Sequence, residues 1–172
     1  MQHYFSKITA PVPRMMEPSF EKLLVKLAEA DIAFIVVGGA AVTFQGYVRL
    51  TEDLDILVEH SPENLTQLLT TLSHYGEGFA KELALEDFSD QEGAIRIVEE
   101  TEQMQLDIFT RMSGRRYPDI LTDADFFTIQ EKQIAVASKR SLIGWKEKSL
   151  RDKDRLDAQA LHILQQNPHA FD

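Results

Sequence analysis

Asp53 and Asp55, two aspartates separated by one residue, are the side chains in this sequence whose spacing points most directly to chemistry. They begin the run DLDILV, which predicts a β-strand, and alternate residues of a strand point to the same face of its sheet. Two carboxylates would then share one site, and a hard divalent cation that prefers oxygen ligands relieves their repulsion. The spacing therefore predicts a magnesium site.

A pair of glycines precedes these acids. Gly38 and Gly39 follow the apolar, β-prone run from Ala33 to Val37, and a short helix broken at Gly46 is expected before the acidic strand. Residues without a Cβ let phosphate oxygens approach the backbone amides at the start of a helix. The order of strand, diglycine turn, helix and acidic strand therefore suits a triphosphate bound together with a metal ion.

Asp107 is a third carboxylate with the same alternation. It lies between Leu106 and Ile108 in the second of two predicted strands, Ala94 to Glu99 and Gln103 to Thr110. Alone, each of the three acids would be interpreted as an ordinary surface carboxylate. If the two acidic strands are neighbours, however, the three carboxylates converge on one metal site.

The rest of the sequence predicts the elements that must position these residues. Apolar spacing and capping residues indicate helices, whereas β-prone runs separated by turn residues indicate a hairpin. We expect a loosely ordered lead-in over residues 1–16, a mixed-sheet core over 33–137 and C-terminal helices over 138–166. The predicted helices are Ser19 to Asp31, Pro62 to Tyr75 with Ser61 as N-cap, Ser138 to Leu150 and Asp152 to Gln166, and the hairpin strands are Phe126 to Ile129 and Gln133 to Ala137.

Length and composition predict one soluble domain. The chain has 172 residues, of which 44% are hydrophobic, enough for one substantial core. It has no cysteine, which suits a reducing cytoplasm and excludes thiolate chemistry. No apolar run reaches the length of about 18 residues that a membrane helix requires, so we expect a cytoplasmic protein without a membrane partner.

The pattern GG, thirteen residues, then DLD resembles the nucleotide-binding signature of the DNA polymerase β-like nucleotidyltransferase superfamily. Within it, the segment VVGGAAVTFQGYVRLTEDLDILV is most similar to small bacterial nucleotidyltransferases of the abortive-infection (AbiEii-like) toxin group. The resemblance covers roughly Ala33 to Leu164. It implies an α+β fold, in which a mixed β-sheet is flanked by helices and followed by a helical C-terminal segment.

The resemblance also implies roles for particular residues. The metal ligands would be Asp53, Asp55 and Asp107, the nucleotide would be bound by Gly38, Gly39, Arg49, Thr51, Lys146 and Asp157, and the three metal ligands and Lys146 would be catalytic. Two Mg²⁺ ions, for which Mn²⁺ could substitute, would bind the triphosphate and activate the acceptor. One departure concerns Gly39, because most of the superfamily has a serine there whose hydroxyl could contact phosphate.

Charge is distributed unevenly along the chain. The net charge is −10, from 18 basic and 28 acidic residues, and the basic residues are concentrated in residues 111–116 and 139–155. An acidic protein repels nucleic acid at long range, so an RNA or tRNA acceptor would depend on these two basic segments. A phosphate contact and simple solubility are both open interpretations of the 111–116 segment.

The leading hypothesis is a metal-dependent enzyme that transfers NMP from an NTP to a hydroxyl of RNA, a protein or a small molecule. The resemblance further implies a toxin with a partner antitoxin protein. Two alternatives stay open: a non-catalytic module of the same fold that binds a nucleotide or a protein, and a metal-dependent phosphohydrolase that uses water as the acceptor.

Overall fold

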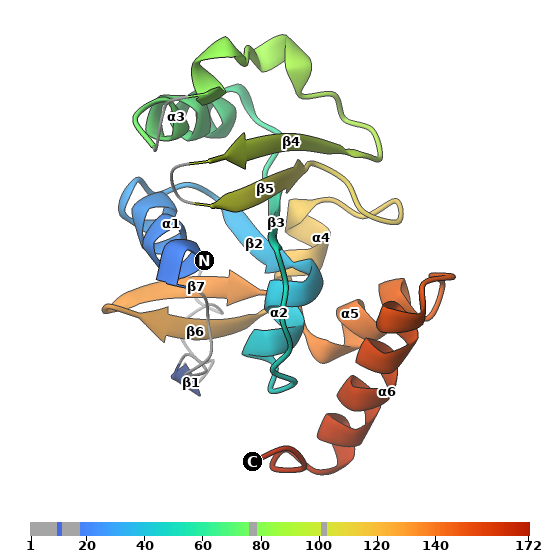
Figure 1. The fold of residues 1–172 in the computed structure, drawn as a ribbon. Helices are drawn as coiled ribbons and strands as arrows, with labels where there is room; N and C mark the ends of the chain where they lie inside the picture. Colours follow the sequence, from blue (N-terminus) through green and yellow to red (C-terminus); the bar gives the residue numbers. More distant parts are fainter. Residues whose placement is uncertain (1–9, 12–17, 76–78, 101–102) are drawn as a thin grey trace.

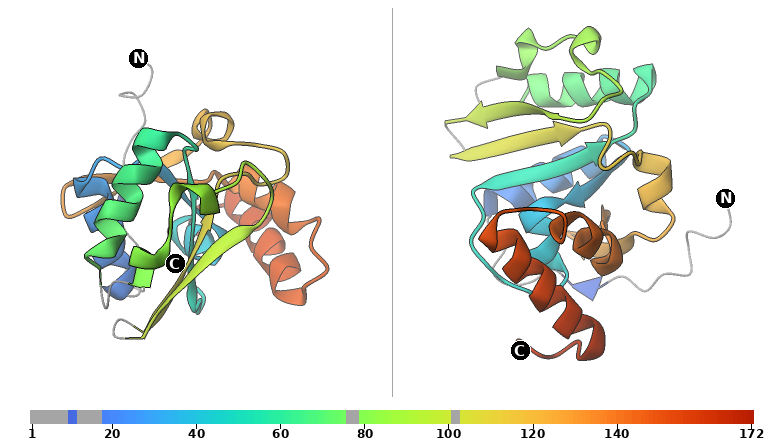
Figure 2. Two further views of the ribbon diagram at one scale, coloured as in Figure 1. Left: turned by 90° about the horizontal axis from the view of Figure 1, so that it is seen from above. Right: turned by 90° about the vertical axis from the view of Figure 1, so that its right-hand side faces the viewer.

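One sheet of seven strands organises the molecule, with helices on both of its faces (Figures 1 and 2). The computed structural model describes residues 10–11, 18–75, 79–100 and 103–172. Along the sheet the strand order is β1-β6-β7-β2-β3-β5-β4, with both parallel and antiparallel neighbours. The strands are β1 (Ala10–Pro11), β2 (Phe34–Val37), β3 (Asp53–Val58), β4 (Ala94–Glu99), β5 (Met104–Phe109), β6 (Asp125–Ile129) and β7 (Lys132–Val136).

The helices begin and end at residues whose chemistry explains the boundaries. Ser61 and Ser138 accept hydrogen bonds from the backbone N–H of Asn64 and Ser141, so both act as N-caps, as predicted. The α-helices are α1 (Pro18–Glu29), α2 (Gly38–Phe44), α3 (Pro62–Ser73), α4 (Tyr117–Leu121), α5 (Lys139–Lys146) and α6 (Asp152–Gln166), and two short 3₁₀ turns are η2 (Phe79–Glu82) and η3 (Leu85–Asp87). None of the helices in the described ranges is long and apolar enough to cross a membrane.

The buried core lies against one face of β3 and β5. Leu54 and Ile56 pair in register with Leu106 and Ile108, and all four side chains are buried. Leu23 of α1 packs on this face, as do residues of α3 and η2. The alternation of apolar and acidic residues along these strands therefore separates a core face from a polar face, as the sequence predicts.

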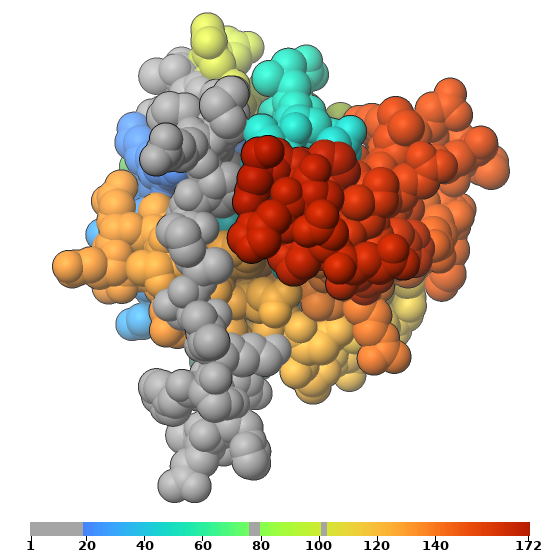
Figure 3. All heavy atoms as spheres, turned by 90° about the horizontal axis from the view of Figure 1, so that it is seen from below, coloured from blue at the N-terminus to red at the C-terminus, as the bar shows by residue number. Residues whose placement is uncertain are grey.

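The other face of the sheet carries the C-terminal helices. Helix α2 packs against β3 and against α5, and α6 packs against α5 on the outside. Seen from below, the red C-terminal segment lies beside the turquoise residues that follow α2 (Figure 3). The rings of Tyr47 and Phe171 are 5.4 Å apart there. The segment that follows α6 thus packs against the loop that leads into β3.

The fold class expected from the sequence, α+β with a mixed sheet and C-terminal helices, is confirmed. Three differences from the predicted elements stand out. The sheet extends into the lead-in, because Ala10 and Pro11 pair with β6, while residues 1–9 and 12–16 lie outside the described part. Helix α4 was not predicted, and α5 ends at Lys146 rather than at Leu150.

Candidate active site

Asp55 and Asp107 lie side by side on neighbouring strands. β3 and β5 are parallel, with Asp55 opposite Asp107 and Asp53 opposite Gln105. All these side chains point away from the core face that holds Leu54. The prediction that the acidic strands are adjacent and in the same phase is confirmed.

The negative charge of Asp55 is disfavoured by its surroundings. Burial, which is the largest cause, and the charges of Asp107 and Asp53 together raise the pKa of its carboxyl from 3.8 to about 7. Lys146 and Arg151 act in the opposite direction, but more weakly. The site therefore disfavours a third negative charge and favours a cation.

Gly38 makes room for this carboxylate. Its φ of +65° is in the left-handed region, and a Cβ at this position would collide with the Asp55 side chain. Only glycine meets both requirements without strain. The first glycine of the pair is therefore needed for the close approach of α2 to Asp55.

Glycine is required at position 39 for a different reason, and the same reason explains why no serine stands there. A Cβ at Gly39 would lie 2.9 Å from Nη2 of Arg49 and 2.9 Å from Oγ1 of Thr51. These two side chains therefore fill the space that a serine side chain at position 39 would require. A guanidinium and a hydroxyl thus occupy the space next to Gly39.

Asp157 holds the guanidinium of Arg49 in place. Its Nε and Nη2 donate to the two oxygens of Asp157 at 2.6 and 2.7 Å, and the Asp157 side chain is fully buried. Lys146 binds the same carboxylate at 2.8 Å and Asp154 at 2.9 Å. Arg49 and Lys146 thus share one buried carboxylate, which fixes both cations between the sheet and the C-terminal helices.

The sequence suggests that Lys146 and Asp157 contact the nucleotide, but in the structure both side chains bind other residues of this buried network. Lys146 and Asp157 would face one stripe only if a single helix continued through both, and the chain instead turns between α5 and α6. The turn brings them together in the interior, where the Lys146 side chain is 9% exposed. Both residues therefore position Arg49, and Asp157 uses its two oxygens entirely within the protein.

Arg96 is a site residue that sequence reasoning missed. Its guanidinium donates to both oxygens of Asp107, at 2.9 and 3.1 Å, while 59% of its side chain is exposed. Strand β4 pairs with β5 so that Arg96 is opposite Asp107. Alternation along β4 does place Arg96 on the polar face, but only the pairing register could identify its partner.

The three carboxylates do not form a closed metal centre in this conformation. In the ranges that the structure describes, no group of three His, Cys, Asp or Glu side chains is positioned to hold a metal ion. The donor set nevertheless fits a hard cation, because Asp53 and Asp55 offer carboxylate oxygens, and burial together with the charges of Asp107 and Asp53 raises the pKa of Asp55. Asp107 lies opposite Asp55 on the neighbouring strand, with both of its oxygens bound to Arg96.

A groove lies beside Asp53. It has a volume of about 560 Å³ and is lined by residues of α1, β3, β4, β5, the loop before β3 and the turn between β4 and β5. Its carboxylates include Glu52 and Glu100, and its apolar wall includes the exposed side chains of Leu50 and Val98. The groove is large enough for a small ligand next to Asp53.

No protein-family model matches this sequence, and no curated protein matches it significantly. Among solved structures, the chain is similar to an antigenic nucleotidyltransferase-like protein from Paracoccidioides brasiliensis, with a TM-score of 0.49 and 16% sequence identity over 87% of each chain. Similarity at this level identifies neither a family nor an activity, so the site must be interpreted from its own geometry.

Proposed function

We propose that this protein transfers a nucleotidyl group from an NTP to an acceptor hydroxyl in a magnesium-dependent reaction. The observation that carries the proposal is the register of β3 and β5, which places Asp55 beside Asp107 with Asp53 nearby on the same face. Gly38 and Gly39 lie at the entrance of α2 beside these acids. Mg²⁺ bound by the carboxylates would neutralise the triphosphate charge and make the acceptor hydroxyl more acidic.

Residues of this chain would bind both the cation and the phosphates. Asp53 and Asp55 hold the cation, and Arg49 and Thr51, which pack against Gly39, contact the phosphates. Positioning matters more than covalent help in this chemistry, because nucleotidyl transfer needs little of the latter. The network behind Arg49 supplies that positioning.

In the reaction, the acceptor oxygen forms a bond to the α-phosphorus and the bond from this phosphorus to the bridging α–β oxygen breaks. Pyrophosphate leaves with the electron pair of the broken bond. Asp107, once separated from Arg96, accepts the proton of the acceptor hydroxyl. Arg96, whose side chain is 59% exposed, would then be a cation without its carboxylate partner.

The experiment that tests this proposal follows each phosphate separately. The protein is incubated with Mg²⁺ and NTPs labelled at the α- or γ-phosphate, with and without total RNA. Transfer yields α-label on an acceptor and γ-label in pyrophosphate, while Asp53→Asn and Asp55→Asn abolish both. Asp31→Asn, at an exposed position just after α1, is the matched control and retains activity.

Other products would support a different function. Release of inorganic phosphate without transfer would indicate a phosphohydrolase. Saturable nucleotide binding without any product would indicate a binding module. This is the second candidate function, because Arg96 occupies both oxygens of the third carboxylate, Asp107. Failure to bind any NTP would exclude the nucleotide site altogether.

The toxin role belongs to the same proposal and has its own test. If the chain is a toxin, its expression alone slows the growth of a bacterial host and Asp55→Asn relieves the effect, with Asp31→Asn as the control. Equal growth inhibition by wild type and Asp55→Asn would show that nucleotidyl transfer is not the cause.

A further inference from the structure

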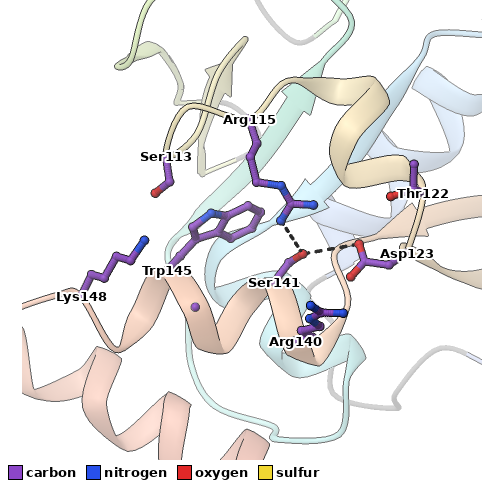
Figure 4. A pocket seen from close by; sticks show the side chains of 9 residues that line it. Ser113, Arg115, Thr122, Asp123, Arg140, Ser141, Trp145 and Lys148 are labelled. Atoms are coloured by element: carbon purple, nitrogen blue, oxygen red, sulfur yellow. Dashed lines mark hydrogen bonds between the residues drawn. The ribbon is translucent and has the colours of Figure 1, made fainter.

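A second pocket lies beside α5, between this helix and the loop after β5 (Figure 4). It has a volume of about 330 Å³, within the range of small-ligand sites. Three of its lining side chains are cations, namely Arg115, Arg140 and Lys148. The two basic segments of the sequence, 111–116 and 139–155, therefore meet here.

The carboxylate in the pocket does not neutralise these cations. Asp123 accepts hydrogen bonds from the hydroxyls of Ser138, at 2.8 Å, and Ser141, at 3.5 Å. A further carboxylate close to the pocket, Glu92, accepts from the backbone N–H of Ser113 and Gly114. With one acid against three bases, the lining is electropositive in a chain of net charge −10.

Arg115 is oriented before any ligand arrives. Its Nη1 donates to Ser141 Oγ at 3.1 Å and its Nη2 donates to the carbonyl of Asp119 at 3.2 Å. A guanidinium has five N–H donors, so further donors are available to a ligand. Figure 4 shows this guanidinium directed toward Ser141 inside the pocket.

The other two cations have no ion-pair partner in the part of the chain that the structure describes. Arg140 and Lys148 are exposed, and neither forms an ion pair with another described residue. Their neighbours in the sequence differ in this respect, because Arg111 and Arg116 bind Asp90, and Lys146 binds two buried aspartates. Part of the positive charge of the basic segments that is not used in ion pairs with described residues thus lies in this pocket.

Trp145 supplies a flat wall. It is half-buried and lies between Arg115 and Lys148 in Figure 4. An indole ring offers a face on which a nucleobase can stack, next to cations that can hold its phosphate. Lys146 points to the buried aspartates instead, so the pocket is separate from the carboxylate site.

We propose that this pocket binds the phosphate of a nucleotide, with Arg115, Arg140 and Lys148 as phosphate contacts and Trp145 against the base. The nucleotide is a free mononucleotide or a unit of an RNA strand, which present the same chemistry. The proposal is independent of nucleotidyl transfer, because it requires neither a metal nor turnover.

The fluorescence of Trp145 tests the proposal directly, because it is the only tryptophan in the chain. The full-length protein is titrated in EDTA with uridine 5′-monophosphate, inorganic phosphate and a short oligouridylate. We expect saturable changes with the mononucleotide, and weaker binding of inorganic phosphate because it has no base. Tighter binding of the oligomer than of the mononucleotide would identify an RNA strand as the source, and the reverse order would identify a free nucleotide.

Variants make the result specific to the pocket. Arg140→Gln and Lys148→Gln should each weaken mononucleotide binding about tenfold, since each removes one charge-assisted contact. Neither side chain has an ion-pair partner among the described residues, so circular dichroism should be unchanged. Lys132→Gln, at the exposed start of β7, is the charge-matched control with unchanged affinity. A fluorescence signal that no ligand changes, or affinities that are equal in all variants, would overturn the proposal.

Discussion

Asp55 keeps a carboxylate where the fold disfavours its charge. Burial and two neighbouring acids raise its pKa to about 7, and the described neighbours that oppose this effect, Lys146 and Arg151, do not cancel it. A residue of this kind does not stabilise the unliganded protein. The proposed metal ion would supply the positive charge that Asp55 lacks, and strongly perturbed acids are concentrated at functional sites.

The stability of the metal-free protein should therefore depend on pH in a specific direction. Between about pH 4 and pH 7, the folded state retains a proton on Asp55 that the unfolded state has lost, so the free energy of unfolding falls as pH rises through this window. Asp55→Asn should flatten the curve and raise the melting temperature at pH 7 in EDTA. Thermal melts from pH 4 to pH 8 measure this effect, and Asp31→Asn should keep the wild-type slope. A lower melting temperature of Asp55→Asn at pH 7 would mark Asp55 as a structural residue.

Arg96 occupies the carboxylate of Asp107, which a metal ion at the proposed site would also require. Its hydrogen bonds to Asp107 raise the pKa of the guanidinium, so the arginine remains charged and occupies the carboxylate. Arg96→Gln should release Asp107 and tighten Mn²⁺ binding, measured by calorimetry, several-fold. Because the Asp107 side chain is only 8% exposed, the loss of Arg96 also leaves a buried carboxylate without its cation, and the melting temperature in EDTA should fall. Arg155→Gln, another exposed arginine, should affect neither quantity, and weaker Mn²⁺ binding by Arg96→Gln would show that Arg96 supports the site instead.

At the scale of elements, the turn into α2 depends on the loop between α2 and β3, which carries Arg49. Gly39→Ser should displace Arg49, because the new side chain needs the space of its Nη2, and Asp157 holds that guanidinium in place. We expect a loss of about 1 to 3 kcal/mol in the free energy of unfolding, as is typical of overpacking. Chemical denaturation measures it. Gly144→Ser is the matched control, since a Cβ there meets nothing within 4 Å, and equal stability of both variants would show that Arg49 moves aside without cost.

The junction of α5 and α6 rests on Lys146. Burial by itself raises the pKa of Asp154, yet hydrogen bonds from Ser149, Lys146 and Arg151 outweigh it and lower this pKa to about 2. Lys146→Ala leaves the Asp154 and Asp157 carboxylates without this cation, and the loss of one partner of a buried ion pair costs about 3 to 5 kcal/mol. Denaturation and nucleotide titration should both show a defect. Lys148→Ala should preserve stability, and a stable Lys146→Ala that only loses nucleotide affinity would restore Lys146 as a direct phosphate contact.

The local chemistry of the site could be predicted from the sequence to a considerable extent. Alternation along DLDILV and MQLDIF determined which face carries Asp53, Asp55 and Asp107, because a one-residue shift would place these acids in the core. The diglycine turn and the short helix after it were also predictable, since only a few residue types adopt the required backbone. These features depend on near neighbours in the chain.

Features that depend on distant partners could not be predicted. The Arg96 pair follows from the register of β4 on β5, and the burial of Lys146 follows from the angle at which α6 returns over α5. The strand at Ala10 is only two residues long and has no periodicity of its own. In each case the deciding energy comes from tertiary packing, which the local pattern does not contain.

At the scale of the whole molecule, charge is sorted by surface. Acidic residues line the groove next to Asp53, whereas the pocket beside α5 collects Arg115, Arg140 and Lys148. The two proposed ligand sites therefore have opposite electrostatic preferences, on one small protein of net charge −10. General screening by salt would also relieve the self-repulsion of such a chain, so a metal effect must be separated from an ionic-strength effect.

Comparison of MgCl₂ with NaCl at equal ionic strength makes this separation. Both salts should stabilise the protein by screening, but Mg²⁺ should add the free energy of site binding, which reaches about 2.7 kcal/mol at a concentration one hundred times the Kd. For a protein of this size, each kcal/mol corresponds to a rise of about 2 to 4 °C in melting temperature. The additional rise should disappear when Asp53 and Asp55 are both replaced by Asn, whereas the effect of NaCl should largely persist, since only two of the 28 acidic residues are removed. Identical melting curves of the wild type in the two salts would mean that Mg²⁺ acts only through ionic strength and that the carboxylates of β3 do not form a metal site.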